Sequence, residues 1–248
     1  MLPDSNTDTL AEIYSRQIMM KEVGQAGQQA IANASVLVIG CGGLGAPVLY
    51  YLAAAGIGHL GLCDGDTVSH SNLNRQLLYT MDDIGKPKAS TAGIRLHTLS
   101  PRLLTTVYDN WLDEGFADSI VPEYDICVDC LDNFNTRFIL NDACIKAGKP
   151  FVHAGISEFY GQLMTVTPGT GPCLRCIFPT EKQKDESAKP FGVVGPTPGA
   201  VGAFQALEVL KYILGLPVSN EGLVIYDGLN MSLEKVPITA SSSCMCRK

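Results

Sequence analysis

The stretch Val36–Pro47, VLVIGCGGLGAP, decides the fold. A run of β-forming residues leads directly into Gly40, Gly42 and Gly45, which have the spacing Gly-x-Gly-x-x-Gly and enclose Gly43 in the same turn. In such a turn the first glycine permits a tight bend, the second lets a phosphate approach the backbone, and the following helix N-terminus favours an anion. The stretch therefore predicts a strand, a nucleotide-binding turn and a helix.

Strand and helix patterns alternate on both sides of this turn. Strands are expected at 35–40, 59–64, 103–108, 124–130 and 150–155, and helices before residue 33 and at 44–55, about 87–100, 113–120 and 133–147. This alternation predicts a Rossmann-like α/β fold with a doubly wound, mostly parallel sheet. We place the nucleotide-binding half at about residues 30–156.

The last third of the chain has a different pattern. Residues 161–168 alternate like an antiparallel strand, and we expect a helix at 200–215 and two final strands at 222–228 and 232–238. Residues 179–198 are rich in charge, proline and glycine and predict an exposed crossover loop. These segments predict an antiparallel C-terminal lobe at about 157–248. No linker separates the two halves, so we expect one domain over residues 1–248.

The composition is that of a globular protein, because 46% of the 248 residues are hydrophobic and 17% are charged. The formal net charge of −7 argues against non-specific binding to nucleic acid, which requires a basic surface. The uncharged segment Ser35–Cys63 is interrupted by glycines and Pro47, so we expect no membrane span. Residues 1–17 contain no apolar signal core, which predicts a cytoplasmic protein.

Two acidic residues follow the second predicted strand. Asp64 lies 19 residues after Gly45, about where a dinucleotide-binding fold places the carboxylate that binds ribose. Asp66 is a close competitor, and the sequence leaves the choice between them open. The glycine turn and these acids alone favour a nicotinamide-dependent oxidoreductase as strongly as any other nucleotide-binding protein.

The segment 71–89, SNLNRQLLYTMDDIGKPKA, favours a different nucleotide. It contains six side chains suited to phosphate, those of Asn72, Asn74, Arg75, Gln76, Lys86 and Lys88, and we assign Asn72, Arg75, Gln76 and Lys88 to the phosphates. Hydride transfer does not need so many, whereas a triphosphate requires cations that bind more strongly as charge moves to a leaving pyrophosphate. The segment therefore predicts ATP. The alternative is that Lys86 and Lys88 only begin an exposed helix and that Gln76 is a surface residue.

Asp132, in the segment DCLDN, ends a predicted strand at the carboxyl edge of the sheet, where ligands bind in open α/β folds. A carboxylate beside a triphosphate suits Mg²⁺, which commonly takes one or two carboxylates together with phosphate oxygens. We therefore assign Asp132 to magnesium. The alternative is that this aspartate caps the following helix.

Four of the nine cysteines lie in a loop or in the tail rather than in predicted core elements. Cys173 and Cys176 have the C-x-x-C spacing of a zinc half-site, whereas Cys244 and Cys246 are separated by one residue. We expect a four-thiolate structural zinc site that attaches the tail to the loop. A free or oxidised tail is the alternative.

Six segments in this order, YSRQI, GCGGLG, DGDTVSHSNLNRQ, DIGKPK, DCLDN and CLRC, resemble the bacterial ThiF/MoeB/HesA relatives of ubiquitin-activating enzymes. The resemblance runs from about Ile13 to the end of the chain. It implies that ATP binds the glycine turn and adenylylates the C-terminal carboxylate of a small ubiquitin-like sulfur carrier ending in Gly-Gly. The carrier would be ThiS-like or MoaD-like and serve thiamine, molybdopterin or related sulfur-incorporating biosynthesis. A sulfurtransferase is a further implied partner.

The resemblance also implies residue roles. Asp64 or Asp66 would bind the ribose, Asp132 the magnesium, and Asn72, Arg75, Gln76 and Lys88 the phosphates. Arg16, in YSRQI, would reach the triphosphate of the other subunit in a homodimer, although by sequence alone it resembles a surface charge. Relatives carry a second C-x-x-C near the C-terminus, from which the tail here departs. Some also carry a cysteine before GVVGP, where this chain has none, so we expect no covalent adduct with the carrier there.

Two other classes of function explain less of the sequence. An oxidoreductase would use the glycine turn and Asp64 but leave Arg75, Lys88 and Asp132 without a role. A non-catalytic, partner-binding scaffold would not need a full set of phosphate-binding side chains.

Overall fold

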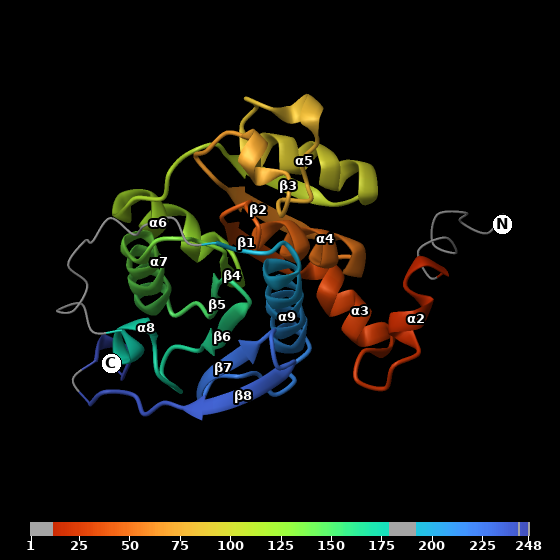
Figure 1. Ribbon diagram of the computed structural model, residues 1–248. Helices are drawn as coiled ribbons and strands as arrows, with labels where there is room; N and C mark the ends of the chain where they lie inside the picture. The colour runs from red at the N-terminus through yellow and green to blue at the C-terminus, as the bar shows by residue number, and fades with distance from the viewer. Residues whose placement is uncertain (1–11, 179–191, 243, 248) are drawn as a thin grey trace.

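An eight-stranded sheet organises the computed structural model, which describes residues 12–178, 192–242 and 244–247 (Figure 1). The strand order is β3-β2-β1-β4-β5-β6-β7-β8. The strands are β1 Ser35–Ile39, β2 His59–Cys63, β3 Leu104–Tyr108, β4 Ile126–Asp129, β5 Phe151–Ser157, β6 Tyr160–Val166, β7 Gly222–Asp227 and β8 Ser232–Pro237. Strands β1 to β5 pair in parallel, and β5 to β8 pair antiparallel. The predicted fold class is confirmed.

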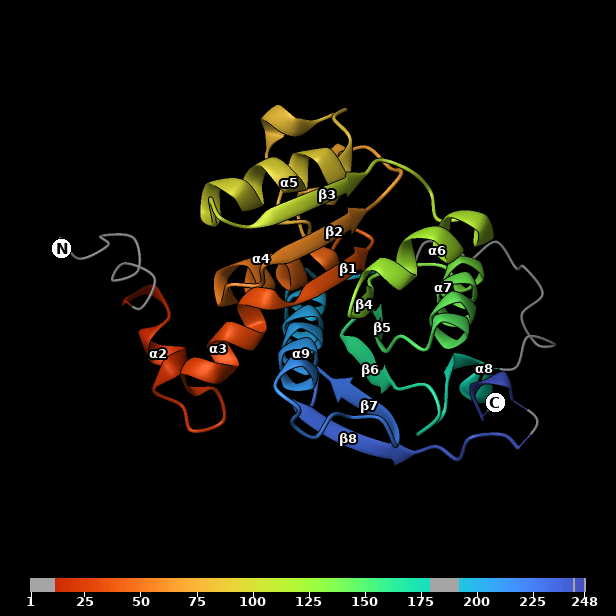
Figure 2. The same cartoon turned by 180° about the vertical axis from the view of Figure 1, so that it is seen from behind.

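Helices cover both faces of the parallel part of the sheet (Figures 1 and 2). The α-helices are α2 Ser15–Ile18, α3 Gly24–Asn33, α4 Gly45–Ala55, α5 Lys88–Leu99, α6 Glu114–Ile120, α7 Phe134–Ala147, α8 Leu174–Ile177 and α9 Pro196–Ile213. Short 3₁₀ turns are η1 His70–Asn72, η2 Met81–Asp83, η3 Val121–Glu123 and η5 Met245–Arg247. Helices α3, α4, α5 and α9 contribute to the core on one face, and α6, α7 and α8 to the core on the other.

The alternation of side chains in β1 explains the two cores. Val36 and Val38 pack into the first core, whereas Leu37 and Ile39 pack into the second. All four are at most 2% exposed, as expected for a strand of a parallel sheet with both faces covered. The uncharged segment Ser35–Cys63 forms β1, α4 and β2. No described helix is long and apolar enough to cross a membrane.

The start of α9 differs from the sequence prediction. The helix was expected from residue 200, but it begins at Pro196. Pro196 and Pro198 lie in its first turn, where the backbone N–H that proline lacks would have no partner within the helix. Thr197 is 3% exposed, so the predicted exposed loop ends earlier than residue 198. Residues 179–191 of that loop lie outside the described residues.

Candidate nucleotide and adenylylation site

A cavity of about 940 Å³ lies at the carboxyl ends of the parallel strands. Its volume is in the upper range of small-molecule sites. Segments far apart in the sequence form its wall, from the glycine turn after β1 to Ile225 of β7. The cavity lies where open α/β sheets bind their ligands.

The glycine turn leaves no room for side chains at its two ends. Gly40 has φ 96°, and a Cβ there would lie 2.5 Å from the Cys130 carbonyl oxygen. A Cβ on Gly45 would lie 2.0 Å from the Gly40 carbonyl oxygen, so this glycine permits close packing of helix against turn. Gly40, Gly42 and Gly43 line the cavity, whereas Gly45 does not. The turn therefore presents backbone, not side chains, to a ligand.

The two acidic candidates after β2 both line the cavity but are held differently. Asp64 accepts hydrogen bonds from the backbone N–H groups of Cys41, at 2.8 Å, and Asp66, at 2.9 Å. Burial raises the pKa of Asp64, and these hydrogen bonds only partly offset it. Asp66 forms an ion pair of 2.6 Å with Lys88, and its side chain is 49% exposed. The choice of ribose ligand stays open.

Three of the four predicted phosphate-binding residues lie on the cavity wall: Arg75, Gln76 and Lys88. The Lys88 side chain is only 7% exposed, and Gln76 Oε1 is buried without a hydrogen-bond partner among the described residues. Arg75 donates through Nη1 to the Ser71 carbonyl oxygen at 2.7 Å. Two cations and a buried amide therefore face the cavity beside the glycine turn.

Asn72 is placed differently from this group. It is 8% exposed, and its Oδ1 accepts a hydrogen bond from the Ser69 N–H at 3.0 Å, which caps η1. It does not line the cavity. Its predicted contact with phosphate therefore stays a prediction, and its observed role is to hold the segment that carries Arg75.

Asp132 lines the cavity with an exposed side chain. The cap of α7 is Asn133, whose side chain accepts a hydrogen bond from the Thr136 N–H. Within the part of the chain that the structure describes, Asp132 makes one long contact, with Asn133 Nδ2 at 3.4 Å. The alternative interpretation of Asp132 as a helix cap is therefore wrong, and its carboxylate faces the cavity free to accept a ligand.

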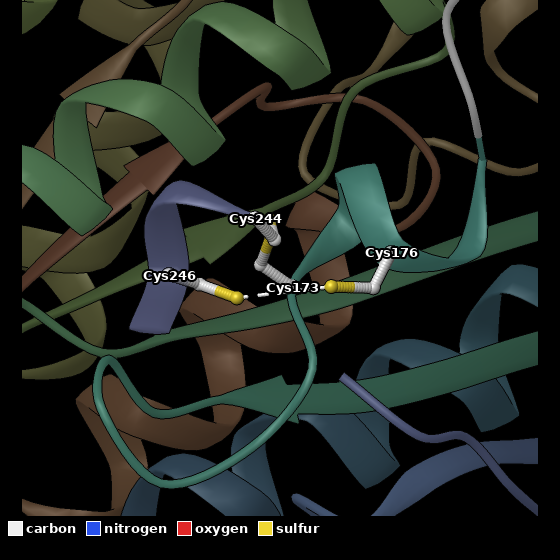
Figure 3. Close-up of side chains that lie close together, drawn as sticks. All are labelled: Cys173, Cys176, Cys244 and Cys246. Carbon is white, nitrogen blue, oxygen red and sulfur yellow. Dashed lines mark hydrogen bonds between the residues drawn. The ribbon is translucent and has the colours of Figure 1, made fainter. Parts of the chain in front are cut away.

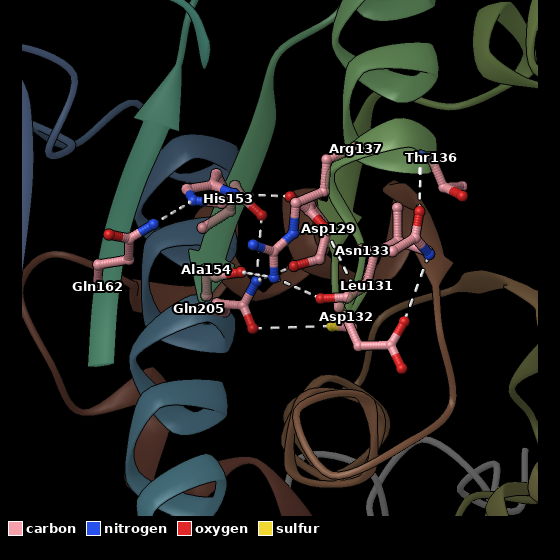
Figure 4. A network of polar contacts seen from close by, with 12 residues as sticks. Asp129, Leu131, Asp132, Asn133, Thr136, Arg137, His153, Ala154, Gln162 and Gln205 are labelled. Carbon is pink, nitrogen blue, oxygen red and sulfur yellow. Dashed lines mark hydrogen bonds and ion pairs between the residues drawn. The ribbon is translucent and has the colours of Figure 1, made fainter. Parts of the chain in front are cut away.

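Next to Asp132 lies a buried polar network that sequence reasoning missed (Figure 4). Asp129 is fully buried and accepts a hydrogen bond from His153 Nδ1 at 2.6 Å, and His153 Nε2 lies 3.1 Å from Gln162 Nε2. Burial lowers the pKa of His153, although the Asp129 carboxylate partly opposes this shift. Arg137 completes the network, with Nε 3.6 Å from Asp129 Oδ1. These residues come from β4, α7, β5 and β6, so no sequence spacing reveals them.

The end of the cavity beyond Asp64 is more apolar. Ile39, Trp111 and Leu112 line it, and a Cβ on Gly65 would lie 2.7 Å from the Trp111 ring. Trp111 is 71% exposed despite its large apolar ring. This end of the cavity offers surface for a nucleobase, and nothing in the local sequence indicated it.

The four cysteines predicted to bind zinc lie together (Figure 3). Their sulfur atoms are all within 4.8 Å of one another. Cys173 Sγ lies 3.4 Å from Cys244 Sγ, and Cys176 Sγ lies 3.7 Å from Cys246 Sγ. Zn–S bonds of about 2.3 Å place tetrahedral sulfurs about 3.8 Å apart, so this donor set fits zinc. The C-x-C spacing of the tail does not prevent the cluster from forming.

Arg16 lies apart from the cavity of its own chain. It is an exposed residue of the short helix α2, and it is not part of the cavity wall. Helix α2 packs against α3, on the side of the molecule away from α6 and α7 (Figures 1 and 2). Arg16 therefore does not reach the cavity of its own chain.

A model of the ThiF family matches residues 14–248. The chain belongs to the ThiF family. The resemblance carried by the six sequence segments is thereby confirmed. Among relatives, the sulfur carrier protein adenylyltransferase of Thermus thermophilus is 42% identical over 241 residues, covering 93% of this chain and 88% of that protein. The SAMP-activating enzyme E1 of Haloferax volcanii is 40% identical over 239 residues, covering 95% and 88%.

A third ThiF-family relative is longer. The adenylyltransferase and sulfurtransferase MOCS3 of Mus musculus is 43% identical over 226 residues, which is 90% of this chain but 49% of MOCS3. The chain thus spans about half the length of that protein. Among solved structures, E. coli MccB with AMPCPP and MccA superimposes with a TM-score of 0.86 at 25% identity, covering 98% of this chain and 76% of MccB.

Proposed function

We propose that this ThiF-family protein uses ATP to adenylylate the C-terminal carboxylate of a ubiquitin-like sulfur carrier ending in Gly-Gly, with release of pyrophosphate. The observation that carries the proposal is one cavity that combines a bare glycine turn, the cations Arg75 and Lys88 and the free carboxylate of Asp132. Relatives of 40% and 42% identity that are named for activating SAMP and a sulfur carrier protein support it.

Adenylylation of a carboxylate does not require a general base in the site. The nucleophile is a carboxylate, which is already ionised at neutral pH. One of its oxygens attacks the α-phosphorus of ATP, the bond from that phosphorus to the bridging oxygen breaks, and the electron pair leaves with pyrophosphate. Lys88 and Arg75 stabilise the charge that moves onto the leaving group, and the glycine turn orients the phosphates.

Asp132 would hold the magnesium ion of MgATP. Among the described residues its exposed carboxylate has one contact, a long one of 3.4 Å, which leaves its oxygens available to a cation that prefers oxygen ligands. When bound, magnesium would neutralise phosphate charge. Asp64 or Asp66 would bind the ribose, and the apolar end at Trp111 would take the base.

Cys173, Cys176, Cys244 and Cys246 would bind one structural zinc ion. Their sulfur separations of 3.4 and 3.7 Å across the two pairs support this proposal. A bound zinc would join the C-terminal tail to the segment that begins α8. The site would contribute folding energy rather than chemistry.

The proposed assembly is a cytoplasmic homodimer in which Arg16 of one subunit reaches the triphosphate bound by the other. The exposed position of Arg16, outside its own cavity, supports this arrangement. The carrier would be ThiS-like or MoaD-like, in thiamine, molybdopterin or related biosynthesis. A sulfurtransferase is a further proposed partner, and the naming of MOCS3 as a sulfurtransferase as well supports it.

The test of the proposed function is exchange of labelled pyrophosphate into ATP in the presence of candidate carriers. Exchange that requires both the protein and one carrier with an intact Gly-Gly terminus supports adenylylation. No exchange with any carrier, together with tight binding of NADH, would instead favour the oxidoreductase. A carrier that lacks its final glycines is the matched control.

A further inference from the structure

Two hydrogen-bond donors lie close to Gly155, on β5. A Cβ built on this glycine would lie 3.3 Å from Arg137 Nη1 and 3.2 Å from Gln162 Nε2. All three residues line the cavity. A side chain at position 155 would press against both donors, so glycine here keeps their N–H groups open to the cavity.

Two nitrogens of the Arg137 guanidinium make no hydrogen bond among the described residues. Nη2 donates to the carbonyl oxygens of Leu131 and Ala154. Nε is buried 3.6 Å from Asp129 Oδ1, an ion pair without a hydrogen bond, so Nη1 is the nitrogen beside Gly155 that is left for a ligand. Nη1 has no hydrogen-bond acceptor among the residues that the structure describes. Arg137 is 6% exposed, and a buried cation with free N–H groups favours an anionic ligand.

The second donor is oriented by the buried network. Because the Asp129 carboxylate can only accept, His153 Nδ1 carries the proton and its Nε2 is the acceptor. Gln162 must then present its amide nitrogen to His153, at 3.1 Å, with one N–H used and one left. The free N–H belongs to the same nitrogen that lies 3.2 Å from the Cβ position of Gly155, and Gln162 lines the cavity.

Arg137 and Gln162 lie apart from the residues predicted to bind phosphate. The glycine turn follows β1, whereas Gly155 and Gln162 lie on β5 and β6, two and three strands further along the sheet. At about 4.8 Å per strand, this is a displacement of roughly 10–14 Å. The protein substrate of an adenylylation must lie on the β5–β6 side of the nucleotide. Its reacting group, a carboxylate, is an anion.

We propose that Arg137 Nη1 and Gln162 Nε2 bind the C-terminal carboxylate of the substrate protein, at the part of the cavity wall beside Gly155. This assignment rests on the proposed adenylylation. One carboxylate oxygen accepts from the two donors, and the other remains free to attack the α-phosphorus, with pyrophosphate leaving as described above. Asp129 and His153 act as positioning residues, because they fix the orientation of the Gln162 amide.

The experiment compares two forms of one carrier, the one that supports pyrophosphate exchange with the wild-type protein. One form has its natural carboxylate, and the other is amidated at the C-terminus. Wild-type protein is expected to bind the carboxylate form about tenfold more tightly, the effect of a charged hydrogen bond. Gly155→Ala, which crowds both donors, and Gln162→Leu, which removes one of them, should each reduce this preference to below about threefold.

Three measurements make the result specific. The KM for ATP should stay within about twofold of wild type in both variants, because the phosphates bind elsewhere. Gly115→Ala, in α6 and outside the cavity, is the matched glycine control and should keep the preference. Melting temperatures show whether each variant is folded. Arg137→Ala is not used, because it would also release the carbonyls of Leu131 and Ala154.

The inference is overturned if folded Gly155→Ala and Gln162→Leu keep the wild-type preference for the carboxylate form. It is also overturned if the variants lose ATP affinity instead, which would assign the donors to the nucleotide. Failure of the proposed function itself gives a different result, because then no carrier supports exchange with the wild-type protein.

Discussion

Lys88 Nζ lies 2.6 Å from Asp66 Oδ2 at the edge of the cavity, and the Lys88 side chain is 7% exposed. Lys86, two residues earlier, has a 55% exposed side chain and pairs with Asp83 at 3.1 Å instead. The two lysines are similar in sequence context, but only Lys88 lines the cavity. They therefore form a natural pair of test and control.

Replacing Lys88 with alanine should lower kcat for pyrophosphate exchange by at least about 10²-fold, because a cation aimed at the leaving group stabilises the transition state. Lys86→Ala should change kcat by less than about twofold, since its ion pair is partly exposed. Steady-state exchange kinetics with a fixed carrier measure both. Equal losses in the two variants would contradict the assignment of Lys88.

The buried imidazole of His153 should stay neutral at pH 7. Burial lowers its pKa below the ordinary 6.5, so the unfolded chain binds more protons than the folded one as the pH falls below that value. The stabilising contribution is therefore complete above about pH 6.5 and is lost in more acidic solution, by up to about 1.4 kcal/mol per pH unit. Urea unfolding between pH 8 and pH 5.5 measures this decrease.

An NMR titration checks the same group directly, with the signal assigned by its disappearance in His153→Gln. The imidazole should titrate below pH 6.5 and carry its proton on Nδ1, as the hydrogen bond to Asp129 requires. A pKa at or above 6.5 would show that Asp129 stabilises the charged imidazole more than burial destabilises it. The proposed orientation of Gln162 would then lose its basis.

Purified protein should contain about one zinc ion per chain, and chelation should lower its melting temperature, because structural zinc contributes to folding. Cys173→Ala should abolish zinc binding. Cys144→Ala, which removes a fully buried thiol outside the cluster, should retain it. Metal analysis of the wild-type protein and the two variants measures the zinc content of each. A Cys173→Ala protein that keeps its zinc would contradict the proposed four-cysteine zinc site.

Complementation tests the contribution of Arg16 across a dimer. Arg16→Ala and Lys88→Ala should each be inactive, but after subunit exchange half of the dimers carry one variant of each kind. Each such dimer has one intact site, so about a quarter of wild-type exchange activity should return. Lys88→Ala mixed with Asp132→Ala is the control, because both residues line the same cavity and no intact site can form. No recovery with Arg16→Ala would place Arg16 in its own subunit's site or outside the site.

Local patterns predicted the parallel half of the fold well because its central strands, such as β1 and β4, are buried on both faces. The run Val36–Ile39 is apolar at every position, and the glycines that follow permit only one kind of turn. The beginning of α9 was missed because Pro196 and Pro198 resemble loop residues, although the first turn of a helix accommodates proline.

The cavity wall was predicted where a short local motif marks it, as at the glycine turn and Asp132. Arg75, Gln76 and Lys88 lie within one short stretch and all line the cavity, whereas their contact with phosphate stays a prediction. Arg137 and Gln162 were missed, because their roles depend on contacts between α7, β5 and β6 that no local pattern encodes. The choice between Asp132 and Asn133 as the cap of α7 likewise required backbone geometry.

The central claim is tested most directly by mass spectrometry of a Gly-Gly carrier incubated with ATP and this protein. The wild-type protein should convert the carrier to its acyl-adenylate, and Asp132→Ala should slow this conversion by at least about 10²-fold. Asp118→Ala, which removes an exposed carboxylate paired with Lys146, should match wild type. Failure of the wild-type protein to form an acyl-adenylate with any Gly-Gly carrier, or undiminished formation by Asp132→Ala, would contradict the account.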